Sequence, residues 1–179
     1  TFAQNPQAPG QVDSPGANAG REAPTLWPAQ RDCLDALVAA QAAGNNRLLV
    51  KMPTGTGKTV TFAALLQWPG FVAWMEQFPK NERRVLVIAH REELLDQAAD
   101  KIRRSNPDLM VSIEQGDRHA NNWSDVVIAS IQTLSAMKYR RLHKLMSRHK
   151  FRLVIVDEAH HAAAASYRTT LVHLGFLPP

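Results

Sequence analysis

The chain has 179 residues, which is enough for one ordinary domain and short for two. Apolar residues make up 45% of it and charged residues 21%, as in globular proteins, and no apolar run approaches the roughly 20 residues of a membrane helix, which excludes a membrane-spanning class. The net charge of +5 favours polyanionic partners. The single cysteine, Cys33, excludes an intrachain disulfide and suits a reducing intracellular compartment.

Residues 1–25 form a segment of biased composition. The segment is rich in Pro, Gly, Gln, Asn and Ala, so we expect it to be disordered, with the folded domain spanning residues 26–179. It carries one Arg before Glu22, unlike an Arg-rich mitochondrial presequence. Because the chain starts at Thr1 without a methionine and stops just after a helical pattern, we expect it to be part of a longer protein.

The first elements are predicted to be a helix, a strand and a second helix. Pro28 suits the first position of a helix that continues, with apolar residues at helical spacing, until Gly44. The run Leu-Leu-Val at 48–50 predicts a buried strand. The glycine-containing turn at 53–57 then leads into a helix from Lys58 to about Leu66.

The rest of the chain predicts an α/β fold. Residues 68–81, which include two prolines and a glycine, predict an irregular connection. Beyond them, aliphatic runs alternate with helical periodicities, which predicts a mainly parallel sheet with helices on both faces. The predicted strands are Val85–Ala89, Val111–Ile113, Val126–Ala129 and Leu153–Val156, and the predicted helices are Glu92–Arg103 and one through Leu134, Met137, Leu142 and Leu145.

The segment at 52–59, Met-Pro-Thr-Gly-Thr-Gly-Lys-Thr, has the pattern of a phosphate-binding P-loop, with Met52 where the general pattern has its first glycine. Glycines let backbone N–H groups turn toward a phosphate, and the N-terminus of the following helix adds partial positive charge. Lys58 would hold the β- and γ-phosphates, and Thr59 would bind Mg²⁺. The alternative is an ordinary glycine-rich turn. The candidate cofactor-binding residues of this loop are Pro53, Thr54, Gly55, Thr56, Gly57, Lys58 and Thr59.

Two carboxylates, Asp157 and Glu158, directly follow the strand predicted at 153–156. We expect this strand to lie beside the strand that enters the P-loop, so that both acids face the phosphates at the carboxyl edge of the sheet. Asp157 would hold Mg²⁺ while Glu158 would orient and polarise the attacking water, because hydrolysis depends on positioning and charge neutralisation. The alternative is a pair of solvated acids at a strand end.

Residues 52–59 and the run Asp-Glu-Ala-His-His at 157–161 resemble motifs I and II of superfamily 2 helicases. The double histidine is similar to that of type III restriction translocase subunits, related bacterial repair helicases and fungal mitochondrial DNA branch-migration helicases. The resemblance implies a RecA-like P-loop NTPase fold, with ATP and Mg²⁺ as cofactors. It also implies a catalytic role for His160, beside Lys58, Asp157 and Glu158, in communication with a second lobe.

Three further segments follow the order that the family has. Leu26–Gln30 resembles its adenine-reading segment, in which Gln30 would hydrogen-bond the adenine edge with both amide atoms. Ala89-His90-Arg91 resembles motif Ia, and residues 130–133 resemble motif Ib. The resemblance implies nucleic-acid contacts by His90, Arg91, Gln132 and Thr133. Taken singly, these residues fit helix caps or surface polar groups equally well.

The resemblance covers about residues 26–177, without motif III or the second lobe, so the chain alone should bind nucleotide weakly and scarcely hydrolyse it. It implies a translocase acting on duplex or branched DNA, with the second lobe as a partner in the same protein and residence in mitochondria. The alternatives are an RNA helicase and a nucleotide-dependent docking module without motor activity. Between Asp125 and Asp157 there are seven basic residues and no acid, for which we favour a solvated face over a nucleic-acid patch.

Overall fold

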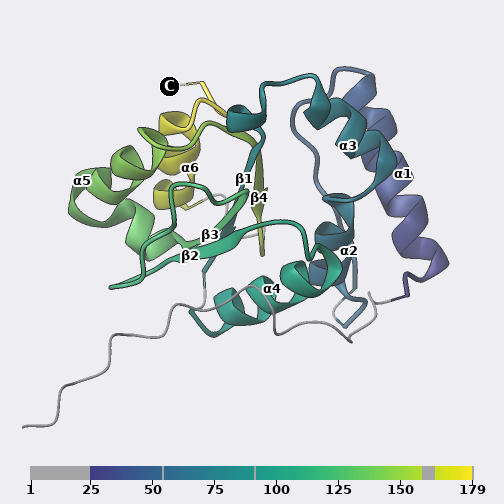
Figure 1. Ribbon diagram of the computed structural model, residues 1–179, viewed down its shortest axis with the longest axis horizontal. Coiled ribbons are helices and arrows are strands. Elements are labelled where there is room, and N and C mark those ends of the chain that lie inside the picture. Colours follow the sequence, from purple (N-terminus) through teal and green to yellow (C-terminus); the bar gives the residue numbers. More distant parts are fainter. Residues whose placement is uncertain (1–24, 54, 91, 159–163, 179) are drawn as a thin grey trace, which may run out of the picture.

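A four-stranded parallel sheet lies at the centre of the part of the chain that the computed structural model describes, residues 25–53, 55–90, 92–158 and 164–178 (Figure 1). The strands are β1 (Arg84–Ala89), β2 (Val111–Glu114), β3 (Val126–Ser130) and β4 (Phe151–Val156), in the spatial order β2-β3-β1-β4. All three pairings are parallel. The four strands predicted after residue 84 are therefore confirmed.

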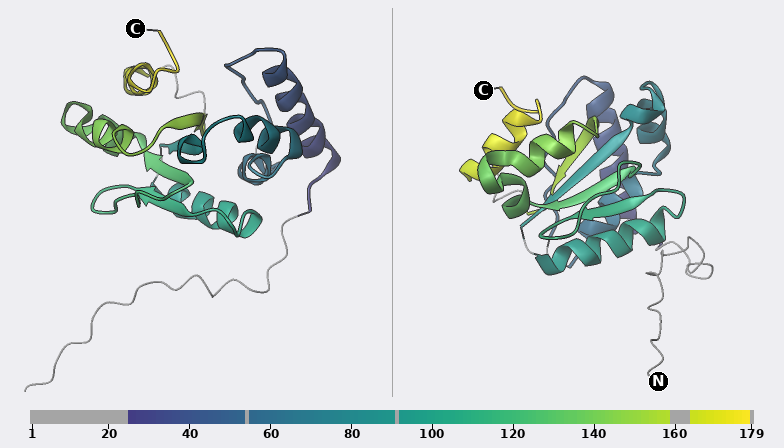
Figure 2. Two further views of the ribbon diagram at one scale, coloured as in Figure 1. Left: turned by 45° about the horizontal axis from the view of Figure 1, so that its top comes forward. Right: turned by 60° about the vertical axis from the view of Figure 1, so that its left-hand side comes forward.

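Helices cover both faces of this sheet (Figure 2). On one face α4 lies against the strands, with α2 beside it, α1 packed on α2, and α3 packed on α1. On the other face α5 lies against β3 and α6 packs on α5. The bounds are α1 (Pro28–Ala42), α2 (Lys58–Leu65), α3 (Pro69–Glu76), α4 (Glu92–Ser105), α5 (Ile131–Met146) and α6 (Ala165–His173).

The alternation of side chains along β1 explains the two covered faces. Val85, Val87 and Ala89 belong to the hydrophobic cluster on the α4 side, whereas Leu86 and Ile88 belong to the cluster on the α5 side. All five are nearly inaccessible to solvent. A strand buried on both faces needs an unbroken aliphatic run rather than an alternating one, and the sequence of β1 provides it.

The segment that enters the P-loop is not a strand, which corrects the prediction for residues 48–50. Residues 45–53 adopt neither helix nor strand, and Leu48, Leu49 and Val50 are 44%, 78% and 38% exposed. Within the described residues β4 pairs with β1 alone, so β4 does not lie beside a P-loop strand as predicted. An aliphatic run becomes a strand only where another strand offers hydrogen-bonding partners, and the described residues offer none to this segment.

The connection at 68–81 is also more regular than predicted, since it contains α3 and a short 3₁₀ helix, Lys80–Glu82. Pro69 occupies the first turn of α3, where its missing N–H has no helical partner to lose. The indole N–H of Trp68 donates to Asp35 on α1 at 2.9 Å. Gly70 then allows α3 to approach α1, because a Cβ at this position would collide with Val38. Pro and Gly here start and pack a helix rather than interrupt one.

Helix α5 is interrupted in its middle. Residues 136–139 depart from helical geometry, and Met137, Lys138 and Tyr139 have φ values of +48°, +53° and +64°. Met137, predicted on the buried face, is instead 79% exposed, whereas Leu134 and Leu142 on either side are fully buried. The apolar spacing correctly identifies the two helical parts but not the break between them.

Replacing Gly70 by alanine should destabilise the protein. The new Cβ must displace Val38, at a cost of about 1–3 kcal/mol, which exceeds the about 1 kcal/mol that alanine gains over glycine in a helix. We expect Gly70→Ala to lower the free energy of unfolding in urea by about 1 kcal/mol.

The double variant Gly70→Ala/Val38→Ala tests the cause. The double variant should lose less free energy of unfolding than the two single variants lose in sum, since the obstructing methyl groups of Val38 are gone. If the losses of the two single variants added up to that of the double variant, the contact between α1 and α3 would not require a glycine.

Candidate functional site

The carboxyl ends of three neighbouring strands meet at one edge of the sheet. Ser130 ends β3, His90 follows β1 and Asp157 follows β4. The register pairs Ala89 with Ser130, and the N–H of Asp157 donates to the carbonyl of Ile88 at 2.9 Å. Ligands of open parallel sheets bind at this edge, so these side chains form the candidate site.

The P-loop turns into α2 through two left-handed glycines. Gly55 has φ +82° and Gly57, the residue that precedes α2, has φ +80°. A Cβ at Gly57 would lie 2.7 Å from Nε2 of Gln30, so both conformation and space require glycine there. Between them, Thr56 bonds back to the carbonyl of Pro53 through its hydroxyl at 2.7 Å. The first N–H groups of α2 have no helical acceptor and can bind an anion.

Gln30 holds this loop from α1. Its Oε1 accepts a hydrogen bond from the N–H of Trp27 at 2.9 Å, and its Nε2 donates to the carbonyl of Thr56 at 3.0 Å. The side chain is 4% exposed. Both amide atoms are therefore engaged by the protein itself, which gives Gln30 a role in shaping the P-loop that sequence reasoning did not predict. The expected contact with adenine stays a prediction.

Asp157 has a partly desolvated carboxylate. Burial raises its pKa above the ordinary value, as does the negative charge of Glu158, while the N–H of Glu158 and the charges of Lys58 and Lys101 act in the opposite direction. The effect of Lys58 shows that its ammonium group lies within electrostatic reach of Asp157. In this conformation Lys58 donates to the carbonyl of Met52 at 3.2 Å. The predicted phosphate-binding lysine thus contacts its own loop and acts on the predicted metal ligand only through its charge.

Glu158 has an uncommon backbone conformation. Its φ is +57°, in the left-handed region that costs non-glycine residues on the order of 1–3 kcal/mol. Its N–H donates to Oδ1 of Asp157 at 3.0 Å, which closes a tight turn just past β4. Strain of this kind persists where the surrounding structure fixes it, and it is concentrated at functional sites.

Three of the candidate nucleic-acid residues, His90, Gln132 and Thr133, make hydrogen bonds beside this site. Nε2 of Gln132 donates to the carbonyl of His90 at 2.9 Å, which ties the start of α5 to the end of β1. The hydroxyl of Ser130 accepts from the N–H of Thr133 at 3.1 Å, as an N-cap of α5. Thr133 also accepts from the N–H of Gly116 at 3.3 Å. His90 and Gln132 are exposed, whereas the hydroxyl of Thr133 is held within the cap.

The structure does not describe all of the predicted site residues. Thr54, Arg91 and His160 lie outside the described residues. Thr59 lies in the first turn of α2 and is half-buried, next to Lys58.

Tyr167 on α6 is a residue near the site that the sequence patterns did not indicate. It is 1% exposed, and its pKa is raised first by burial and then by the charge of Asp157. It belongs to the hydrophobic cluster on the α5 side of the sheet, against which Val154 and Val156 of β4 pack. A single tyrosine in a helical pattern gives no signal of such a position.

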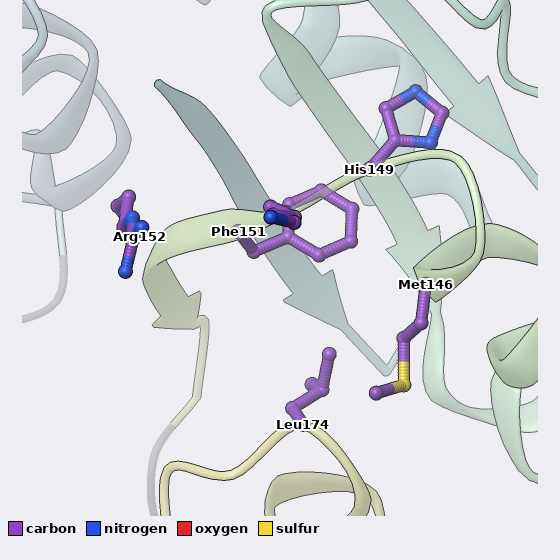
Figure 3. A pocket seen from close by; sticks show the side chains of 6 residues that line it. Met146, His149, Phe151, Arg152 and Leu174 are labelled. Carbon is purple, nitrogen blue, oxygen red and sulfur yellow. The ribbon is translucent and has the colours of Figure 1, made fainter. Parts of the chain in front are cut away.

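Two hollows of about 250 Å³ each lie at the opposite, amino edge of the sheet. One is bordered by Met146, Phe151 and Leu174, whose side chains face one another in Figure 3. Neither hollow includes a candidate site residue. In the described ranges we also find no cluster of three or more metal-ligating His, Cys, Asp or Glu side chains, and no helix with the length and hydropathy to cross a membrane.

The family model described as type III restriction enzyme, res subunit, matches residues 24–175. The "Putative ATP-dependent helicase IRC3" of Saccharomyces cerevisiae is 40% identical over 152 residues, which is 84% of this chain and 21% of the relative. The "Putative mitochondrial ATP-dependent helicase irc3" of Schizosaccharomyces pombe is 34% identical over 150 residues, 84% of this chain and 23% of the relative. The chain thus spans about a fifth of the length of these curated relatives.

Solved structures share the fold. A nuclease-deletion mutant of the Type ISP restriction-modification enzyme LlaGI, in complex with a DNA substrate mimic, matches with a TM-score of 0.59 at 17% identity, covering 82% of this chain and 16% of that one. The UvsW helicase from bacteriophage T4 matches with a TM-score of 0.54 at 18% identity, and the match covers 86% of this chain and 58% of the helicase. This likeness confirms the predicted RecA-like α/β fold.

Neutralising Asp157 should stabilise the protein in the absence of ligands. Because its folded-state pKa is raised, the protonated form is favoured by folding, and this contribution is lost as the pH rises through the folded-state pKa. At pH 7 the ionised carboxylate opposes folding, so we expect Asp157→Asn to melt at a higher temperature than wild type.

This gain should shrink as the pH falls through the raised folded-state pKa and disappear below the ordinary aspartate pKa, where wild-type Asp157 is neutral as well. The exposed Asp108 provides the control, and Asp108→Asn should change the melting temperature little at either pH. A wild type that is more stable than Asp157→Asn at pH 7 would contradict this account.

Proposed function

We propose, from the premise that this chain belongs to the family of the type III restriction enzyme res subunit, that it forms the ATP-binding lobe of an ATP-dependent DNA helicase or translocase. The observation that supports the proposal most is that the positive charge of Lys58, from the P-loop, acts to lower the pKa of Asp157, at the end of β4. Nucleotide hydrolysis requires a phosphate-binding loop and a metal-binding acid to lie close together, and the influence of Lys58 on Asp157 supports such an arrangement.

The roles follow from the geometry. The amides of residues 53–57 and the start of α2 would hold the phosphates, with Lys58 swinging from the Met52 carbonyl onto the β- and γ-phosphates. Thr59 and Asp157 would hold Mg²⁺. Asp157 fits this task because its carboxylate is partly desolvated. Of the two oxygens of this carboxylate, only Oδ1 accepts a hydrogen bond from a described residue. A cation would offset that desolvation.

Mg²⁺ would neutralise charge on the phosphate oxygens when bound. Glu158 would orient the attacking water and polarise it toward the γ-phosphate, and it directly follows Asp157 in the tight turn after β4. His160 would communicate with a second lobe, which in this family supplies an arginine to the site. An arginine finger raises the rate of hydrolysis by about 10³–10⁵-fold. Without the second lobe, this chain alone should therefore hydrolyse ATP very slowly.

DNA is proposed as the polymer that the protein moves along. The net charge of +5 suits a polyanion, and His90 and Gln132 form an exposed pair beside the nucleotide site. The related LlaGI structure holds a DNA substrate mimic, which supports DNA over RNA. The name of the Schizosaccharomyces pombe relative supports a mitochondrial location, which imaging of the tagged intact protein in cells would test.

Replacing Glu158 by glutamine should separate hydrolysis from binding. Glutamine keeps the size of the side chain but cannot act as a base, so we expect ATP hydrolysis by the intact protein, measured as phosphate release with saturating duplex DNA, to fall by about 10²–10⁴-fold. ATP binding, measured by titration calorimetry, should persist.

Glu93→Gln is the matched control, since Glu93 is exposed on α4, and it should hydrolyse ATP at the wild-type rate. Stimulation of the wild type by RNA instead of duplex DNA would favour an RNA helicase. If Glu158→Gln kept the full biological effect of the protein, a docking module without motor activity would replace this proposal.

A further inference from the structure

The structure sorts the acid-free basic stretch of residues 126–156 into two groups. Arg141, which is partly buried, pairs with the buried Glu114, and Lys150 and Arg152 pair with Glu82. The other four basic residues are all exposed and have no described acidic partner: Lys138, Arg140, Lys144 and Arg148. Ion pairs within the protein therefore account for three of the seven basic residues but not for these four.

Arg140, Lys144 and Arg148 are spaced four residues apart. Arg140 and Lys144 lie in α5, and Arg148 lies in the turn that closes it. Residues four apart on a helix are neighbours on one face, about 6 Å apart along the axis, and like charges in such positions destabilise the helix. A row of cations without compensating acids is therefore unfavourable in isolation and becomes favourable against a polyanion.

The interruption of α5 adds to this surface. Three consecutive non-glycine residues, 137–139, adopt left-handed conformations, which are individually costly. The result is that Met137 and Lys138 point into solvent directly before Arg140. Of the three left-handed residues, only Tyr139 packs against the core, so the break leaves two side chains exposed.

An exposed tryptophan borders the far end of the row. Trp123 is 73% exposed and lines a hollow of about 250 Å³ together with Asn122, Arg148 and Lys150. Its backbone is fixed, because its carbonyl accepts from Arg84 at 3.0 Å and its N–H donates to Asn121 at 3.0 Å. The hollow is smaller than the roughly 300–1,000 Å³ of typical small-molecule sites, and its open indole suits the stacking of a single flat ring.

Arg141 fixes the loop before β3 onto α5. Its guanidinium donates to Glu114 at 2.6 Å, to the carbonyl of Gly116 at 2.7 Å and to that of Arg118 at 3.0 Å. Glu114 in turn accepts from the N–H of Ala120 at 2.6 Å. The loop that leads toward Trp123 is thus tied to α5, the helix that begins beside the candidate nucleotide site and carries Arg140 and Lys144.

We propose that this surface, defined by Arg140, Lys144, Arg148 and Trp123 and named the α5 track, binds a single-stranded arm of the nucleic acid. The three cations contact successive phosphates, and Trp123 stacks on an unpaired base. The track would continue the nucleic-acid contact from the carboxyl edge of the sheet along the outside of α5. This inference rests on the proposed function, because it requires a protein that binds nucleic acid.

Removing two cations of the track should lower the salt dependence of binding. Each phosphate contact to a single strand contributes about 0.7 to the slope of log affinity against log salt, so Lys144→Gln/Arg148→Gln should reduce that slope by about 1.4. The measurement is fluorescence anisotropy of forked DNA with a single-stranded arm, titrated with the intact protein over a salt series. Trp123→Ala should weaken binding about tenfold at one salt concentration, and Trp123→Phe should restore most of it.

The matched control is Lys80→Gln/Arg104→Gln, which removes two exposed cations elsewhere on the chain and should leave the slope unchanged. Hydrolysis of ATP without DNA should be the same in all variants, since none touches the nucleotide site. A slope equal to that of wild type in Lys144→Gln/Arg148→Gln would overturn the α5 track while leaving the proposed function intact. Absence of DNA binding by wild type would overturn both.

Discussion

Parallel pairing of β1 with β3 and β4 is the constraint on which the rest of the structure depends. It carries the chain back across the sheet after each strand, so that every carboxyl end arrives at the same edge. Asp157, His90 and Ser130 come from distant parts of the sequence and meet there because the register of the hydrogen bonds aligns them. The P-loop joins this edge from α1, through the hydrogen bond between Gln30 and Thr56.

The candidate site is a place where the fold gives up stability. Asp157 is a carboxylate partly removed from water, Glu158 has a left-handed backbone, and two glycines hold the P-loop in conformations that other residues avoid. The desolvated carboxylate and the left-handed Glu158 oppose folding, and in the proposed function a bound cation would offset the first of these costs. A site of this kind is expected where charge must be positioned before the substrate arrives.

Local patterns in the sequence were sufficient to predict most of the helices and strands. The helix at Lys58, the strand ending at Val156 and the acids after it depend on neighbours in the chain, and the structure has them where they were predicted. The predictions failed where contacts with residues distant in the sequence determine the local structure. The aliphatic run at 48–50 lacks a partner strand, and Gly70 permits a helix because Val38 lies opposite. The second role of Gln30 and the position of Tyr167 likewise depend on contacts that no spacing shows.

The central claim is that Lys58 and Asp157 belong to one Mg²⁺-ATP site, and calorimetric titration of the intact protein with Mg²⁺-ATP tests it most directly. Loss of a charged hydrogen-bonding group is worth about 1.5–3 kcal/mol, so Lys58→Ala should bind at least about tenfold more weakly than wild type. Lys51→Ala, which removes an exposed lysine just before the P-loop, should bind as wild type does. Equal affinity of wild type and Lys58→Ala would contradict the account.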